Sequence, residues 1–167
     1  MSVLNPFLLD IYEELLAMIK NLFRNAILIA SVALAGSVVA ADCEITIEAN
    51  DAMRYGTSEI SIDKSCQEFT VHLKHVGKLP AASMGHNWVL SKTADVEAIS
   101  KDAIAAGRDN GYLKADDSRV IAHTKMLGGG EEDSVTFETS KLKGDEGYAF
   151  FCSFPGHYAM MKGHLKL

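Results

Sequence analysis

The sequence predicts an all-β domain, a two-sheet sandwich or barrel with one short helix, preceded by an export leader. Short segments in which apolar and polar residues alternate predict the strands, since this pattern gives a strand one buried and one solvated face. Beyond the leader, only one segment has apolar residues at helical spacing, and a single uncharged run near the N-terminus is typical of a secretory signal. We therefore expect antiparallel strands around one core.

The leader is expected to span residues 1–40. The run from Ala26 to Ala41 has 16 residues without a charge and follows Lys20 and Arg24. A membrane-spanning helix needs about 20 apolar residues, so this run is short for an anchor and suits the apolar region of a signal peptide. Small residues at its end, Val38 and Ala40, place the expected cleavage after Ala40.

The first 17 residues of the leader are apolar and acidic, where a signal peptide should begin with a short basic segment. Met18 opens such a segment. Translation is therefore expected either from Met18, which is the favoured hypothesis, or from Met1 with an amphipathic extension that could stay at a membrane.

The exported domain is expected to be residues 41–167, and its strands follow from alternation with period 2. One helix is expected from Asp95 to Ala106, with Gly107 able to end it. The inward-facing strand positions are expected to be Ile45 and Ile47; Phe69, Val71 and Leu73; Trp88 and Leu90; Val135 and Phe137; Tyr148, Phe150 and Cys152; and Leu165 and Leu167.

Composition narrows the class of protein. With 167 residues, 48% of them hydrophobic, and a net charge of −6, the chain is long enough to bury a core and is not disordered. No segment is rich in Lys or Arg, so the chain has no cluster of positive charge that would attract the phosphates of a nucleic acid. The Asp and Glu residues show no paired arrangement for acid-base catalysis and are expected to be solvated.

Three cysteines in an exported chain cannot all pair within it. Neither Cys43 nor Cys66 has a metal-binding partner near it, such as the His157 and Met161 that follow Cys152. A bond between them would close a loop of about two dozen residues, worth about 3 kcal/mol in the chain-entropy description. Cys152 would then remain free.

Cys152 begins a Cys-x4-His-x3-Met segment that continues to His157 and Met161. Thiolate, imidazole and thioether donors together select copper over magnesium or calcium, and an electron-transfer copper site needs a second histidine. His86 is the candidate, although 66 residues separate it from Cys152. A buried inert thiol and the neighbouring Met160 are the competing interpretations, and the loop count favours Met161.

Residues 41–167 resemble the azurins, small periplasmic blue-copper proteins of the cupredoxin family. The resemblance rests on the ADC start, DKSC, MGHNWVLS, DDSRVIAHTK, DSVTF, FFCSFPGH and the final MKG. It implies a Greek-key β-sandwich and one type 1 copper ion. The matching ligands are His86, Cys152, His157, the axial Met161 and the backbone carbonyl of Gly85; Asn87 matches the residue that ties the ligand loops together, and Cys43 and Cys66 match the disulfide of the family.

The resemblance also implies a function. It predicts a single-electron carrier, not an enzyme, in the periplasm of a Gram-negative bacterium. Its transient partners would be c-type cytochromes and periplasmic redox enzymes, and it would have no stable membrane association once the leader is removed. Electrons are expected to pass through the exposed edge of His157, inside an apolar docking patch of Met53, Leu79, Met84, Phe154, Pro155, Ala159 and Met160.

Two alternatives and one further residue complete the expectations. Copper storage without electron transfer would need an open site rich in thiols or thioethers, and a Cys-His enzyme would need an oriented third group that the sequence does not offer. His75 continues the inward parity of its strand and matches a position linked to pH-dependent redox behaviour. Tyr158 is bulkier than the small residue expected beside the exposed ligand, so the resemblance leaves its role in the choice of partner open.

Overall fold

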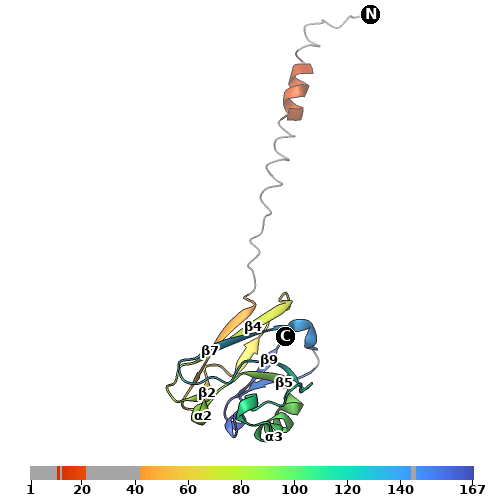
Figure 1. Ribbon diagram of the computed structural model, residues 1–167. Helices are drawn as coiled ribbons and strands as arrows, with labels where there is room; N and C mark the ends of the chain where they lie inside the picture. Colours follow the sequence, from red (N-terminus) through yellow and green to blue (C-terminus); the bar gives the residue numbers. More distant parts are fainter. Residues whose placement is uncertain (1–10, 12, 22–41, 144–145) are drawn as a thin grey trace, which may run out of the picture. The chain divides into compact units, whose positions relative to one another are not determined.

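The computed structural model describes residues 11, 13–21, 42–143 and 146–167. The chain divides into two units, Met1–Ala40 and Ala41–Leu167. Figure 1 shows the strands and the helix α3 of the second unit. Residues 11 and 13–21 are helical. Within the described part of the chain, no helix has the length and apolar character needed to cross a bilayer. The uncharged run from Ala26 to Ala41 and the expected cleavage site lie outside the described residues.

The second unit is built from two sheets. The four-stranded sheet has the order β2-β1-β4-β7 and the five-stranded sheet the order β3-β9-β8-β5-β6. The strands are β1 (Glu44–Asn50), β2 (Arg54–Tyr55), β3 (Glu59–Ser61), β4 (Glu68–His75), β5 (Val89–Lys92), β6 (Val120–His123), β7 (Glu132–Glu138), β8 (Tyr148–Phe151) and β9 (Lys162–Lys166).

The expected antiparallel pairing holds for most neighbours but is wrong for two of them. β1 pairs with β4 in parallel, as β3 does with β9, while the other named pairs are antiparallel. Parallel neighbours need a long connection, and each of these pairs is separated by other strands in the sequence. Both sheets are therefore mixed.

The core lies between the sheets and follows the predicted alternation along β4, but the alternation is wrong for β5 and β8, whose outer faces are buried in a second cluster. Along β4 the buried positions are Phe69, Val71, Leu73 and His75, with half-buried or exposed residues between them. Trp88 has no exposed surface, and its ring stacks with those of Phe137 and Phe150 at centroid distances of 6.1 and 5.9 Å. The two sheets are thus joined by large aromatic contacts.

A helix covers a second, smaller cluster. α3 (Val96–Ala106) follows a 3-10 turn at Thr93–Asp95 and buries Val96 and Ile99. Gly107 ends it with φ 73°, and its N–H donates to the carbonyl of Ala103. The positive φ is the reason for glycine at this end. The short helix α2 (Ala81–Met84) was not expected from the sequence.

The disulfide of the domain joins Cys43 and Cys66, whose Cα atoms are 5.6 Å apart. Cys152 is free and buried. The division of the three thiols therefore agrees with the expectation from the sequence.

Candidate metal centre

Three donor side chains from distant parts of the sequence meet inside the sandwich. The ligand atoms of His86, Cys152 and His157 all lie within 4.8 Å of one another. Cys152 Sγ is 3.9 Å from His86 Nδ1 and 3.7 Å from His157 Nδ1. Among the described residues this is the one group of three histidine, cysteine or carboxylate side chains that could hold a metal ion.

The hydrogen bond of His86 Nε2 determines which ring nitrogen faces Cys152 and His157. His86 Nε2 lies 2.9 Å from the carbonyl oxygen of Asn50, so it donates there and carries the ring proton. Nδ1 is left as an unprotonated donor pointing at the sulfur. Burial lowers the pKa of His86 to about 4, so the ring is neutral at pH 7 and able to bind a metal.

Burial also controls the thiol. Cys152 has no exposed surface, and burial raises its pKa to about 12, against the smaller opposing effect of N–H donation from Asn87 and Phe154. A catalytic cysteine needs a lowered pKa, so this environment does not suit a nucleophile. It suits a metal, which displaces the proton and binds the thiolate.

Gly85 brings its carbonyl oxygen to 3.7 Å from Cys152 Sγ. A Cβ at this position would lie 2.6 Å from the carbonyl oxygen of Ala81 and 2.9 Å from Met126 Sδ. Only glycine fits at such distances without displacing backbone. The carbonyl of Gly85 is therefore held beside the sulfur by close packing.

Burial separates the two candidate methionines. Met161 is fully buried in the same core cluster as Cys152, while Met160 is 59% exposed. The backbone joins the ends of the loop, since the N–H of Cys152 donates to the carbonyl of Met161 at 3.0 Å. This geometry favours Met161 as the thioether donor.

Asn87 links the two segments that carry the donors. Its Nδ2 donates to Ser153 Oγ at 2.8 Å, and its Oδ1 accepts the N–H of Ser153 at 2.9 Å. The side chain is fully buried. A residue next to His86 is thereby fixed to the residue next to Cys152.

His75 lies behind the donor group, and its ring stacks on that of His86 with a centroid distance of 4.5 Å. Its Nδ1 accepts the N–H of Gly77 at 3.1 Å and its Nε2 donates to the carbonyl of Met84 at 2.9 Å. Asp51 Oδ1 is 4.0 Å from Nε2. Both ring nitrogens therefore have hydrogen-bond partners.

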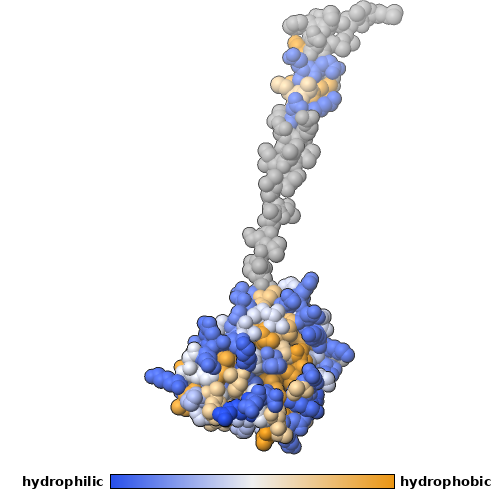
Figure 2. Space-filling model, in the orientation of Figure 1, coloured by the Kyte–Doolittle hydropathy of each residue, from blue (hydrophilic) through white to orange (hydrophobic). Residues whose placement is uncertain are grey.

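His157 is 4% exposed, and the residues predicted to form a docking patch are all half-buried or exposed. Among the residues of this patch, the side chains of Met160 and Leu79 are 59% and 42% exposed. Figure 2 shows hydrophobic surface next to hydrophilic surface on one face of this unit. Tyr158 is half-buried and packs against the cluster beneath α3.

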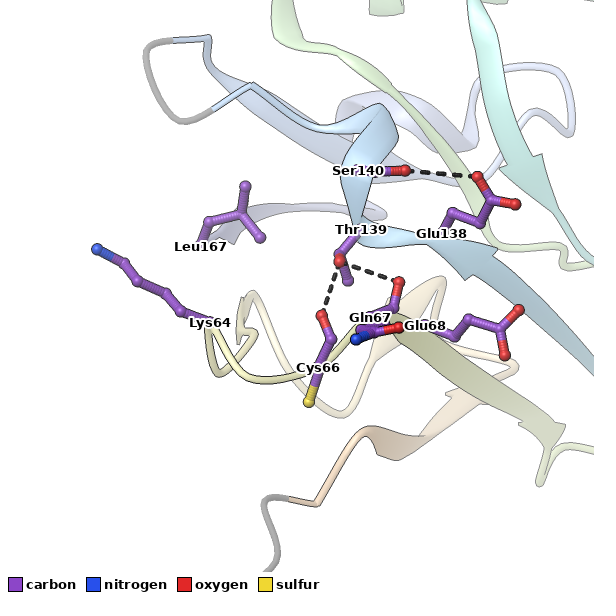
Figure 3. Close-up of a pocket in the computed structure, with 8 residues that line it drawn as sticks. All are labelled: Lys64, Cys66, Gln67, Glu68, Glu138, Thr139, Ser140 and Leu167. Atoms are coloured by element: carbon purple, nitrogen blue, oxygen red, sulfur yellow. Dashed lines mark hydrogen bonds between the residues drawn. The ribbon is translucent and has the colours of Figure 1, made fainter.

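A separate groove lies near the disulfide, with a volume of about 740 Å³ (Figure 3). Thr139 Oγ1 closes one wall by donating to the carbonyls of Cys66 and Gln67, at 2.7 and 3.0 Å. The lining residues are Lys64, Cys66, Gln67, Glu68, Glu138, Thr139, Ser140 and Leu167. None of them is a histidine or a free thiol, so the groove offers no comparable metal site.

Two residues near the donors were not singled out in the sequence. Tyr55, in the two-residue strand β2, donates its hydroxyl to the carbonyl of Asn87. Met126 packs on Gly85. Neither follows a motif or a period, so only the folded structure brings them to the site.

Comparison with known proteins places residues 41–167 in a described family. They match the family model of copper binding proteins, plastocyanin/azurin family. The azurin of Achromobacter denitrificans is 63% identical over 130 residues, which cover 78% of this chain and 87% of that protein. The azurin of Pseudomonas aeruginosa is 57% identical over 134 residues, covering 80% of this chain and 90% of that protein.

Two further comparisons extend this similarity. The azurin of Bordetella pertussis is 57% identical over 150 residues, covering 90% of this chain and 99% of that protein. A solved structure of the azurin Az-iso2 from Methylomonas sp. strain J has a TM-score of 0.73 and 51% identity, over 76% of this chain and 98% of its own. The cupredoxin-type sandwich predicted from the sequence is confirmed.

Proposed function

Because the chain belongs to the plastocyanin/azurin family of copper-binding proteins, we propose that it carries single electrons on one type 1 copper ion bound by His86, Cys152, His157 and Met161. One observation carries the ligand assignment. Two imidazole nitrogens and one thiol sulfur, all buried, lie within 4.8 Å of one another. This donor set, with a distant thioether, is the arrangement of electron-transfer copper sites.

Bound copper supplies the one-electron couple, and the chain supplies a fixed set of donors. His86 is held by Asn50 and the Cys152 loop is held by Asn87, so neither donor needs to move when the oxidation state changes. Burial of Cys152 and Met161 excludes water from the sulfur donors. A site with few rearrangements on electron transfer has a small barrier, which suits a carrier.

Electrons leave through the edge of His157, and the docking patch surrounds that edge. Its apolar residues, including the exposed Met160, suit small and short-lived contacts. The partners proposed are c-type cytochromes and redox enzymes of the periplasm. Similarity to azurins of Gram-negative bacteria supports this location.

Export in this proposal depends on the leader, residues 1–40. The similarity to the Bordetella azurin covers 150 residues, more than the 127 residues from 41 to 167, so it extends into the leader. This supports Met18 as the start. We propose cleavage after Ala40, with Ala41 as the first exported residue. Intact-mass measurement of the exported protein tests this cleavage, and a different first residue would contradict it.

We also propose that protonation of His75 raises the reduction potential of the copper. A positive charge on a ring stacked on His86 opposes Cu(II). Protonation must first break the hydrogen bond from Gly77 to Nδ1, with Asp51 and His86 as the titratable groups that face the ring. The potential should rise as pH falls, and a potential that does not change with pH would contradict the proposal.

Copper(II) added to the purified domain tests the main proposal. We expect intense blue absorption that disappears on reduction and that does not form in Cys152→Ser, because the charge-transfer band requires the thiolate. Met161→Ala should change the spectrum, whereas the matched variant Met160→Ala should leave it unchanged. Blue colour in Cys152→Ser would overturn the ligand assignment. Rapid release of copper would instead support storage, which no observation here favours.

A further inference from the structure

Tyr55 makes a contact with the metal centre that copper binding itself does not require. Its hydroxyl donates to the main-chain carbonyl of Asn87, and its ring packs against Phe150 with a centroid distance of 5.7 Å. Burial, with a smaller contribution from the Cys152 sulfur, holds the pKa of Tyr55 well above its usual range. The hydroxyl therefore remains a hydrogen-bond donor.

The peptide between Asn87 and Trp88 is held at both of its polar atoms. The carbonyl oxygen of Asn87 accepts from Tyr55, and the N–H of Trp88 donates to Thr124 Oγ1 at 2.9 Å. The preceding peptide is held as well, since the carbonyl of His86 accepts the N–H of Leu127 at 2.8 Å. Asn87 thus lies between two fixed peptides.

The same hairpin holds the neighbouring ligand. Asn50, at the end of β1, accepts the Nε2 proton of His86, and Tyr55, in β2, holds Asn87. The turn between them is closed by the N–H of Met53, which donates to the carbonyl of Asn50 at 3.1 Å. One hairpin therefore orients two consecutive residues of the metal centre.

Asn87 connects this constraint to the sulfur, because its side chain holds Ser153, the residue after Cys152, by two hydrogen bonds of 2.8 and 2.9 Å. A backbone hydrogen bond from Asn87 also lowers the pKa of the Cys152 thiol, against the larger effect of burial. A hydrogen bond to a thiolate withdraws electron density from it, and a less donating thiolate stabilises Cu(II) less. Hydrogen bonds at this sulfur therefore raise the reduction potential.

We propose that Tyr55 is a positioning residue: through the carbonyl of Asn87 it keeps the Asn87 N–H on the Cys152 sulfur, and it thereby raises the reduction potential of the bound copper. The inference rests on the proposed function for its redox consequence. The positional part concerns the chain alone and can be measured without metal.

Tyr55→Phe tests the proposal, since it removes the hydroxyl and keeps the ring against Phe150. In the metal-free protein, amide hydrogen exchange at Asn87 should become several-fold faster relative to the amide of Val71 in β4. In the copper-loaded protein, the Cu(II)/Cu(I) ratio at a fixed ambient potential should rise several-fold, where tenfold corresponds to 59 mV for one electron.

Tyr148→Phe is the matched control. The Tyr148 hydroxyl accepts the N–H of Lys143 at 2.7 Å and donates to Glu146 at 2.9 Å, and it has no contact with Asn87. This variant should lose stability but leave both the Asn87 exchange and the Cu(II)/Cu(I) ratio unchanged.

Two results would overturn the proposal: unchanged Asn87 exchange in Tyr55→Phe, or equal changes in both variants. An accelerated exchange with an unchanged Cu(II)/Cu(I) ratio would reject the redox part. If the wild-type protein forms no blue copper complex, the proposed function fails, and the exchange comparison still decides the positioning role.

Discussion

The orientation of each residue of the metal centre depends on its hydrogen bonds to neighbouring residues as well as on its donor atom. The donor types of His86, Cys152 and His157 follow from the sequence, because soft donors at that spacing select copper. Which imidazole nitrogen faces the sulfur does not, since it depends on the carbonyl of Asn50. Contacts across 36 residues leave no local pattern in the sequence.

The lowered pKa of His86 makes the stability of the metal-free protein depend on pH. Between its ordinary pKa of 6.5 and its folded pKa of about 4, the unfolded chain binds a proton that the folded chain does not. The free energy of unfolding therefore rises with pH across this window, by about 3 kcal/mol from pH 4 to 7. Urea unfolding at a series of pH values measures it.

Variants separate this contribution from that of other groups. His86→Gln should reduce the dependence on pH by that amount, whereas His72→Gln, at a half-buried position on the outer side of β4, should retain it. A wild-type slope equal to that of His86→Gln between pH 4 and 7 would contradict the assignment.

At the scale of elements, what could be predicted depends on length and period. β1, β4, β7 and α3 have enough residues to show alternation or helical spacing, and all four were expected from the sequence. β2 and β3 have two and three residues and α2 has four, too few to show a period. β2 carries Tyr55, so the missed strand is also where a residue of the metal centre was missed.

Tyr158 shows how the ligand loop is joined to a neighbouring element. The loop from Cys152 to Met161 tightens into a 3-10 turn at His157–Ala159. Tyr158, in this turn, packs against the cluster that includes Val96 and Ile99 of α3. The side chain therefore contributes to packing under the helix, beyond any effect on the docking surface.

Tyr158→Ser should lower the free energy of unfolding of the metal-free protein by about 1–3 kcal/mol, because it removes a half-buried aromatic ring from this cluster. Met160→Ser, at the exposed neighbouring position, should change it by no more than about 0.5 kcal/mol. Chemical denaturation measures both. Equal stabilities, with a slower electron exchange in Tyr158→Ser alone, would assign Tyr158 to docking instead.

At the scale of the whole molecule, the disulfide and the metal centre lie at opposite ends of the strand β4. Cys66 comes just before β4, and His75 at the end of β4 stacks on His86. Eight residues at about 3.3 Å each separate the two features by roughly 26 Å. The disulfide can therefore stabilise the sandwich without contacting the metal centre.

Removal of the disulfide in Cys43→Ala/Cys66→Ala should cost about 2–5 kcal/mol of unfolding free energy, because the unfolded chain regains the freedom of a loop with a sequence separation of 23. The blue absorption and the reduction potential of the copper-loaded variant should equal those of the wild type, since no ligand or hydrogen bond at Cys152 changes. Thermal unfolding and voltammetry measure the two quantities. A shifted reduction potential at unchanged stability would show that the disulfide end of β4 influences the geometry of His86. The metal centre would then depend on the whole sandwich and not only on its local contacts.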